Sequence, residues 1–219
     1  MDQNISMLPI FIFISLRITS WSRTFLGTFV GHMKHPILFI HGFAGGSYEF
    51  KPIIRYLKSH DDPVCYEFVY KKKFGQVSLK VIAQELHEFI ITHVPEPELD
   101  IVAISQGGVI ARYYIAHYQD RKIRKCITLC SPHHGSLLAY IGILPGIKEL
   151  QPHNSFLKKL DVKKAEYYAV YNPADLMVFP GWFAKFREAK ENKRVLSLLH
   201  PLTFSNQATL KFIYNTLSN

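Results

Sequence analysis

The chain has 219 residues, of which 48% are hydrophobic and 20% are charged, so it is long enough for one well-buried domain. This balance is close to the average of globular proteins and excludes a disordered chain, a collagen-like fibre and a coiled coil. The 26 basic and 17 acidic residues give a net charge of +9, but the basic residues are scattered outside any nucleic-acid-binding motif, which argues against a nucleic-acid partner.

The first 33 residues contain two apolar stretches, at 5–16 and 25–30, ahead of the first convincing strand. The longer one is too short to span a bilayer, which takes about 20 apolar residues. As an export signal it lacks a basic start and a small-residue cleavage site. An export signal, an interfacial membrane anchor and a true start at Met33 are three open alternatives, and the localisation depends on which holds. We expect a segment of residues 1–33 followed by one domain of residues 34–219.

From residue 34 onward, short apolar stretches alternate with helical patterns. Apolar spacing of three to four residues predicts helices, including a face formed by Val81, Leu86 and Ile90. The region 131–162 is rich in proline and glycine and is expected to be loose. Strands are expected at 36–41, 64–70, 99–104, 123–129, 165–171 and 194–199, and helices at 47–59, 76–94, 106–118 and 203–217. This alternation predicts an α/β fold with a doubly wound, mainly parallel sheet, because such strands are buried on both faces.

Three cysteines are too few for a disulfide framework. Cys126 and Cys130 lie four residues apart in one expected strand, too far along it to bridge comfortably. We therefore expect buried free thiols rather than a disulfide or a metal knuckle.

Ser105 lies where the expected strand at 99–104 passes directly into a helix. The sequence Ala103-Ile104-Ser105-Gln106-Gly107 has small residues two positions before and two after the serine, as a sharp strand-to-helix turn requires. Such a turn holds the hydroxyl at the C-terminal edge of the sheet, where the helix N-terminus adds positive potential. A serine in this place can also be an ordinary helix cap, so the nucleophile hypothesis depends on the neighbouring motifs.

A glycine-rich segment, HGFAGG, begins at His41 directly after the first strand. Acyl transfer needs two N–H donors for the reacting oxygen, one from such a loop and one from the residue after the nucleophile. We assign these donors to Phe43 and Gln106, with Gly42 and His41 shaping the loop. The alternative is a plain turn in which the glycines only provide positive φ angles.

In folds with this turn, an acid and then a histidine follow the serine along the chain. His200 is the only histidine after the strand at 165–171, and we expect it to end the last strand at the C-terminal edge of the sheet. Among the acidic residues between Ser105 and His200, only Asp175 lies just past a strand end, and the apolar residues after it would bury the carboxylate. A surface-loop histidine and a helix-capping aspartate are the alternatives.

These residues resemble the α/β-hydrolase superfamily and, within it, the small bacterial lipases and esterases, from about Ile37 to the C-terminus. The segment ITLCSPHHGS at 127–136 is similar to the T-L-x-(S/T)-P-H-x-G-(S/T) segment of triacylglycerol lipases, where it shapes the wall of the site. Residues 149–160 and the turn at 175–180 are also similar to lipase segments. Two positions depart from the pattern: Ile104 stands where lipases often have histidine, and Ala103 stands where they have glycine.

The resemblance implies a carboxylic-ester hydrolase with Ser105 as nucleophile, His200 as base and Asp175 as acid, and Gly107 as the small residue of the turn. It implies an acyl-ester or lipid substrate, with a lipid or membrane interface as a candidate partner, while the oligomeric state is left open. We expect no cofactor and no metal, because no set of carboxylates matches the calcium site of larger lipases. Residues 136–160 are expected to form either a small flap or a packed helix.

Two kinds of alternative function stay open at this point. A thioesterase, an amidase or an acyltransferase could use the same scaffold, because a fold does not choose its substrate. A non-catalytic, membrane-associated protein could also have kept the hydrolase fold.

Overall fold

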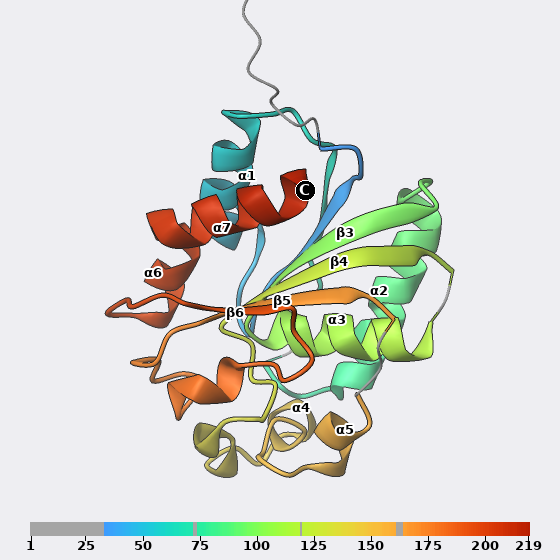
Figure 1. The fold of residues 1–219 in the computed structure, drawn as a ribbon. Coiled ribbons are helices and arrows are strands. Elements are labelled where there is room, and N and C mark those ends of the chain that lie inside the picture. The colour runs from blue at the N-terminus through green and yellow to red at the C-terminus, as the bar shows by residue number, and fades with distance from the viewer. Residues whose placement is uncertain (1–32, 72–73, 119, 161–163) are drawn as a thin grey trace, which may run out of the picture.

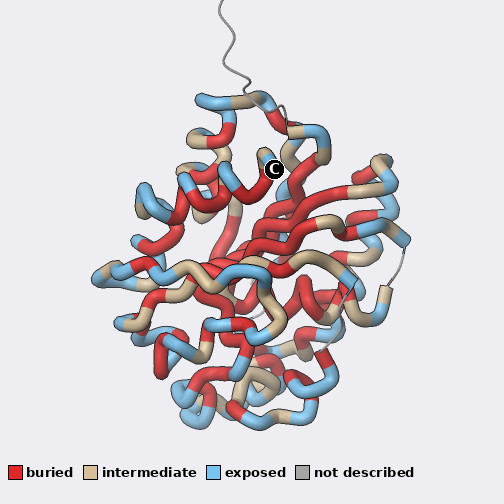
Figure 2. The backbone as a smooth tube through the Cα atoms, in the orientation of Figure 1, coloured by how far each residue is buried: buried red, intermediate tan, exposed pale blue. Residues whose placement is uncertain are grey.

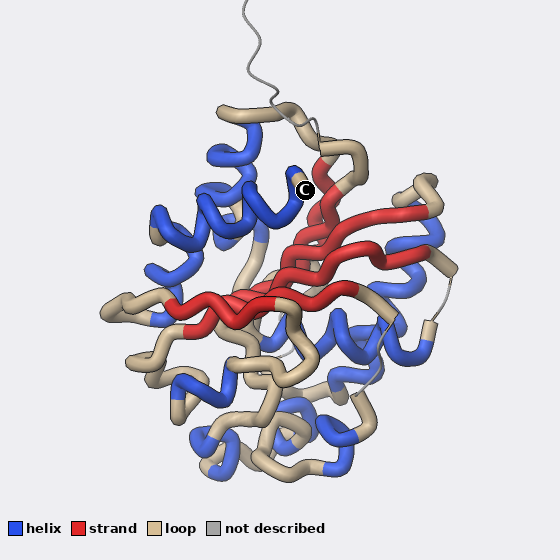
Figure 3. Tube along the Cα trace, in the orientation of Figure 1, coloured by secondary structure: helices blue, strands red, loops and turns tan. Residues whose placement is uncertain are grey.

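The computed structural model describes residues 33–71, 74–118, 120–160 and 164–219. The expectations for residues 1–32 lie outside the described residues. Within the described part of the chain, six parallel strands form one sheet in the order β2-β1-β3-β4-β5-β6 (Figure 1; Figure 3). The strands are β1 (Ile37–Ile40), β2 (Cys65–Phe68), β3 (Glu98–Ile104), β4 (Lys122–Leu129), β5 (Glu166–Tyr171) and β6 (Glu191–Arg194).

Helices cover both faces of this sheet (Figure 1). One layer consists of α2 (Leu79–His93) and α3 (Gln106–His117), and the other of α1 (Lys51–Lys58), α6 (His200–Ser205) and α7 (Gln207–Ser218). The helices of each layer pack against one face of the sheet and form a separate cluster of buried side chains with it. The central strands are therefore buried on both sides (Figure 2). The predicted doubly wound α/β fold is therefore confirmed.

The region expected to be loose contains three short helices, η2 (Leu137–Tyr140), α4 (Pro145–Lys148) and α5 (Ser155–Lys158). Two further 3-10 helices, η1 (Ser47–Glu49) and η3 (Gly181–Ala184), lie in the loops after β1 and β5. Residues 136–160 thus form a series of short helical turns and not the single packed helix that was the alternative to a small flap.

The long helix α2 begins later than expected and buries a different face. Its N-cap is Ser78, whose side chain accepts a hydrogen bond from the Lys80 N–H at 3.2 Å. Leu86 and Ile90 are buried as expected, but Val81 is exposed. Val81 and Leu86 are five residues apart, which is about 140° around an α-helix, so they cannot share a face.

The C-terminal part of the chain differs from expectation in two places. The strand predicted at 194–199 is wrong, because β6 ends at Arg194 and residues 195–199 leave the sheet. The single helix predicted at 203–217 is also wrong: α6 and α7 are separated at Asn206, whose side chain accepts from the Ala208 N–H at 2.9 Å and caps α7. As a result His200 begins α6 instead of ending a strand.

All three cysteines are free thiols. Cys126 and Cys130 are buried, as predicted, and Cys65 is half-buried. In the described part of the chain, every helix falls short of the length and hydropathy that crossing a bilayer demands.

Candidate active site

The C-terminal ends of the parallel strands β1, β3 and β4 lie side by side, and most of the predicted site residues follow these ends. The register pairs Ile104 of β3 with Leu129 of β4, so Ser105 and Cys130 leave the sheet at the same level. β1 pairs with β3 on the other side, which brings the loop that begins at His41 next to the serine. The strand order reverses between β1 and β3, and open α/β sheets usually bind ligands in the crevice at such a point.

Ser105 occupies a sharp turn between β3 and α3. Its φ of 50° and ψ of −123° are rare for a residue other than glycine and cost about 1–3 kcal/mol. The turn is held by the Ser105 N–H, which donates to the Leu129 carbonyl at 2.8 Å, and by the Gly108 N–H, which donates to the Ser105 carbonyl at 3.0 Å. A Cβ atom at Gly107 would lie 2.6 Å from the backbone oxygens of Ile40 and His41, so this position requires glycine.

The two predicted oxyanion donors both lie next to Ser105. Gln106 follows the serine as the first residue of α3, and Phe43 lies in the loop after β1. In that loop Gly42 packs on the serine, since a Cβ at Gly42 would lie 3.0 Å from the Ser105 Cβ. Among the residues that the structure describes, neither the Phe43 nor the Gln106 N–H has a hydrogen-bond acceptor. Both donors are thus available to a ligand oxygen.

Three buried or half-buried side chains hold this loop. The Gly42 N–H donates to Glu49 Oε2 at 2.9 Å, and His41 Nδ1–H donates to the Gly42 carbonyl at 2.8 Å. The His41 ring stacks on Tyr70 at 3.9 Å, and the Tyr70 hydroxyl donates to the Gly42 carbonyl at 3.1 Å. Burial raises the pKa of Tyr70, so it stays a donor. Sequence reasoning missed Glu49 and Tyr70; an acid just after the glycine-rich segment was the available signal for Glu49.

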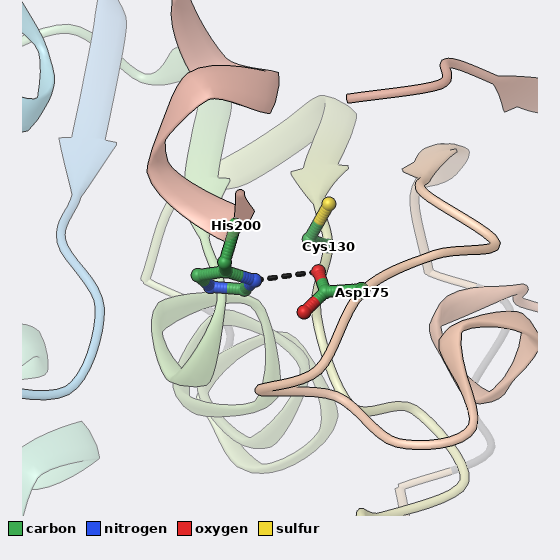
Figure 4. Close-up of side chains that lie close together, drawn as sticks. All are labelled: Cys130, Asp175 and His200. Carbon is green, nitrogen blue, oxygen red and sulfur yellow. Dashed lines mark hydrogen bonds and ion pairs between the residues drawn. The ribbon is translucent and has the colours of Figure 1, made fainter. Parts of the chain in front are cut away.

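Buried Asp175 and half-buried His200 form a pair (Figure 4). His200 Nδ1–H donates to Asp175 Oδ2 at 2.6 Å, and Asp175 Oδ1 accepts from the N–H groups of Met177 at 2.8 Å and Val178 at 3.1 Å. Burial alone would raise the pKa of Asp175, but the hydrogen bonds from His200, Val178 and Met177 outweigh it and lower that pKa. With Nδ1 as donor, a neutral His200 ring presents Nε2 as a proton acceptor.

Cys130 lies beside this pair (Figure 4). Its Sγ atom, an Asp175 oxygen and a His200 ring nitrogen all lie within 4.8 Å of one another. The Ser105 N–H donates to the carbonyl of Leu129, the residue before Cys130, so the Ser105 turn lies beside Cys130. The predicted nucleophile, acid and base therefore all lie at the C-terminal ends of the strands. The structure brings them there from the end of β3 and from the loops after β5 and β6.

Among the described residues, Cys130, Asp175 and His200 form the one group of three or more side chains of the types that bind metal ions. Their chemistry does not favour a metal ion. Burial and the charge of Asp175 raise the pKa of Cys130, which keeps the sulfur as a neutral thiol, and a thiol is a poor metal ligand. His200 Nδ1 is already directed at Asp175.

Two polar side chains that sequence reasoning missed join the loops of this site. Asn172 Nδ2 donates to the Ser197 carbonyl at 2.8 Å, which ties the Asp175 loop to the segment before His200. Ser136 Oγ donates to the Met177 carbonyl at 3.0 Å and accepts from the Phe179 N–H at the same distance. The Asn-Pro-Ala-Asp sequence before the acid was a signal for an Asn-capped turn.

The segment that resembles lipases, residues 127–136, forms a wall of buried polar contacts with α3. His133 Nε2 hydrogen-bonds with Thr128 Oγ1 at 2.9 Å, and burial lowers the pKa of His133 far enough to keep the ring neutral. The guanidinium of Arg112 lies 4.3 Å from the Phe186 ring and 3.3 Å from His133 Nδ1. A cavity of about 360 Å³ beside this wall is not lined by the predicted nucleophile, acid or base, so it is separate from their site.

Comparison with known proteins identifies the family of the chain. A family model described as palmitoyl protein thioesterase matches residues 36–191, which include Ser105 and Asp175 and end before His200. The chain has no match among curated protein sequences.

Among solved structures, the mature lipase BlEst2 of Bacillus licheniformis is similar with a TM-score of 0.65 and 17% identity, over 84% of this chain and 92% of that chain. A monoacylglycerol lipase of Paleococcus ferrophilus is similar with a TM-score of 0.62 and 16% identity, over 84% and 95%. An α/β hydrolase from a metagenome of lagoon sediments has a TM-score of 0.63 and 16% identity, over 83% and 90%. These likenesses show that the chain shares the α/β-hydrolase fold of these enzymes, and the family match shows that it belongs to the palmitoyl protein thioesterase family.

Proposed function

We propose that the protein is a serine hydrolase that cleaves acyl esters through Ser105, His200 and Asp175. The observation that carries the proposal is the part-buried 2.6 Å hydrogen bond between His200 and Asp175, at the C-terminal ends of the strands where the strained Ser105 turn lies. A charged acid in that place fixes the imidazole tautomer and stabilises the imidazolium that forms during attack.

The reaction proceeds in two steps. Ser105 Oγ attacks the carbonyl carbon of the ester while His200 Nε2 takes the hydroxyl proton, and the N–H groups of Phe43 and Gln106 bind the oxyanion. His200 then gives its proton to the leaving group as the bond to the acyl carbon breaks. Water attacks the acyl-enzyme by the same route in reverse, releasing the carboxylic acid.

The surroundings of the pair favour an apolar acyl group in the substrate. Leu176 and Met177, directly after Asp175, are exposed, and so is Leu199, directly before His200. Specific ligand sites combine such apolar walls with a few polar groups that fix orientation. We therefore assign acyl esters of lipid type as the substrates, and a lipid as the partner.

A thioester is the second candidate substrate, and the palmitoyl protein thioesterase match favours it. The same residues serve both reactions, since a thioester and an oxygen ester form the same kind of tetrahedral intermediate. A thiol is a better leaving group than an alcohol, so thioester cleavage depends less on proton donation by His200.

Ser105→Ala tests the function. We expect kcat for a chromogenic acyl ester to fall by roughly 10³-fold or more, since the hydroxyl is the nucleophile. Ser59→Ala, far from the site on the turn after α1, is the matched control and should keep full activity. Full activity in Ser105→Ala, or fluorophosphonate labelling that persists in it, would contradict the proposal.

A substrate panel separates the two candidates. Oxygen esters and thioesters with the same acyl chain are compared by kcat/KM, from short chains to palmitoyl. A preference for the thioesters identifies a thioesterase, and a preference for the oxygen esters identifies a lipase or esterase.

A further inference from the structure

Three loop segments around the Asp175–His200 pair expose large apolar side chains to solvent. They are residues 137–143, 176–182 and 196–202, which we call the apolar rim. The most exposed members are Leu198 at 88%, Ile141 at 81%, Ile143 at 80% and Leu176 at 69%. Single exposed apolar residues are normal on a protein surface, but a group of this size around one site marks an interaction surface.

Hydrogen bonds join the three segments into one surface. The Leu137 N–H donates to the Phe179 carbonyl at 2.8 Å, which joins the first segment to the second. Asn172, in the loop that leads into the second segment, donates to the Ser197 carbonyl of the third at 2.8 Å. The apolar rim is therefore a continuous border of the site and not three unrelated loops.

The three segments of the apolar rim contain no charged residue, and exposed bases lie at their borders. The sequence has no Asp, Glu, Lys or Arg in 129–147, 176–184 or 195–206. Each of these uncharged stretches is bordered by an exposed base, namely Lys148, Lys185 and Arg194. Two acids beside these stretches are engaged in hydrogen bonds: Asp175 accepts from His200, and Glu149 accepts from the Ser78 hydroxyl and the Leu79 N–H, both at 2.6 Å.

We infer that the apolar rim docks on the surface of an anionic phospholipid bilayer. Apolar side chains without charges among them can enter the interfacial layer, while long basic side chains at the border reach the negative headgroups. The inference rests on the proposed function in one respect, because it names the partner that presents the acyl ester to Ser105. Docking on the bilayer does not itself require ester hydrolysis by Ser105.

A second copy of the chain fits this surface less well. A two-fold symmetric dimer places the same patch of both copies face to face, so Lys148, Lys185 and Arg194 would approach the same bases of the other copy. Like charges across an interface are unfavourable, and the net charge of +9 adds to the repulsion. Such a dimer would also close the site.

Vesicle sedimentation of the full-length chain tests the inference. Ser105→Ala is used so that lipid is not consumed, with phosphatidylcholine vesicles prepared with and without phosphatidylserine. We expect binding to the anionic vesicles and much weaker binding to the neutral ones. Adding Leu198→Asp should weaken anionic binding by roughly ten-fold or more, because it removes a buried apolar side chain from the interfacial layer and places a negative charge beside anionic headgroups. Ile91→Asp, at an exposed apolar residue of α2, is the matched control and should bind normally.

A second pair of variants tests how much the basic side chains contribute to vesicle binding. Lys185→Gln should weaken binding to anionic vesicles by roughly five-fold, the equivalent of about 1 kcal/mol per base near the membrane surface. Lys80→Gln, at an exposed base on α2, should not. Residues 1–33 are present in every variant, so the differences between variants report on the apolar rim.

Three outcomes would overturn the inference: no binding to anionic vesicles, equal binding of Leu198→Asp and Ile91→Asp, or a concentration-dependent dimer that Leu198→Asp abolishes. The proposed function is judged separately, by hydrolysis of a short water-soluble ester, which Leu198→Asp should leave unchanged. Docking without any hydrolysis would refute the function alone, and hydrolysis without docking would refute the inference alone.

Discussion

A methyl group added at Gly107 would push the Ser105 turn away from the end of β1. The atoms that a Cβ would meet, at 2.6 Å, are the carbonyl oxygens of Ile40 and His41, and backbone atoms of a central strand cannot move aside as a flexible side chain can. Gly46, in the neighbouring loop, is extended with a φ of 173°, and a Cβ there would touch only the Tyr48 ring, at 3.5 Å.

We therefore expect Gly107→Ala to lose most of its activity and to lower the free energy of unfolding by about 1–3 kcal/mol, the usual cost of overpacking. Denaturant unfolding and kcat/KM measure the two effects. Gly46→Ala should resemble the wild type in both. A Gly107→Ala protein with wild-type kinetics would show that the turn tolerates a side chain.

At Asp175 the lowered pKa gives a prediction about activity. Asp175→Asn keeps the shape but removes the charge that orients and stabilises His200, so kcat should fall by roughly 10³–10⁴-fold. Asp120 is the matched control, because it also lies against a histidine, 2.7 Å from His87 Nδ1, but near the far end of α3. Asp120→Asn should leave kcat unchanged, and equal effects of the two substitutions would contradict a special role for Asp175.

The same carboxylate links stability to pH. Its pKa in the folded protein is lower than the ordinary value of 3.8, so it stabilises the fold above about pH 3.8. This contribution is lost as the pH falls through the lowered folded-state pKa. Acid unfolding followed by circular dichroism should therefore show a weaker dependence on pH below 3.8 in Asp175→Asn than in the wild type.

Among the elements, β3, β4 and α7 are joined by a buried charge at the end of the sheet opposite the site. Asp100 is buried and accepts from Arg124 at 2.6 Å and from the Lys125 N–H at 3.0 Å. Lys125 Nζ donates to the Thr216 carbonyl of α7 at 2.6 Å. Removing one partner of a buried pair leaves an uncompensated charge.

Asp100→Asn should thus destabilise the protein by about 3 kcal/mol in denaturant unfolding. Activity at low temperature should be unchanged, because Asp100 is in the first half of β3 and Ser105 follows its last residue. Glu98→Gln is the control, since Glu98 pairs with Lys122 at the surface, where solvent screens the interaction. Equal stability of Asp100→Asn and Glu98→Gln would refute the importance of the buried charge.

The sequence predicts the central elements well, because burial on both faces leaves a clear apolar pattern. It fails at β6, an edge strand built from the polar residues 191–194, while the apolar residues 195–199 that suggested a strand lie in a loop. An edge strand needs backbone pairing on one side only, so its side chains carry little information. The break at Asn206 was missed because a capping residue can also lie inside a helix.

The candidate site also contains residues that the sequence indicates and residues that it does not. Ser105, Asp175 and His200 can be proposed from the sequence because each follows a rule of local sequence or chain order. Glu49 and Ser136 cannot be found so readily, since their roles come from hydrogen bonds to loops that the fold brings next to them. The separation of 43 residues between Ser136 and Phe179 illustrates why single-sequence patterns do not reveal such contacts.

For the whole molecule, we propose that residues 34–219 form one hydrolase domain. The two hydrophobic clusters are formed by residues from Leu38 to Phe186 and from Ile37 to Leu217, so together they use the chain from β1 to α7. Met33 lies at the border, and its backbone N–H donates to Asp61 Oδ2.

A chain that starts at Met33 should therefore unfold in one cooperative transition and keep the kcat/KM of the full-length protein for a short soluble ester. The new α-amino group at Met33 lies beside Asp61, so the hydrogen bond becomes a charge-assisted one and the new terminus is stabilised rather than frayed. Asp61→Asn in the shortened chain should lower its melting temperature more than in the full-length chain, where the Met33 nitrogen is uncharged. A shortened chain that fails to fold would show that residues 1–32 contribute to the domain, and equal effects of Asp61→Asn in both chains would show that the new terminus makes no ion pair.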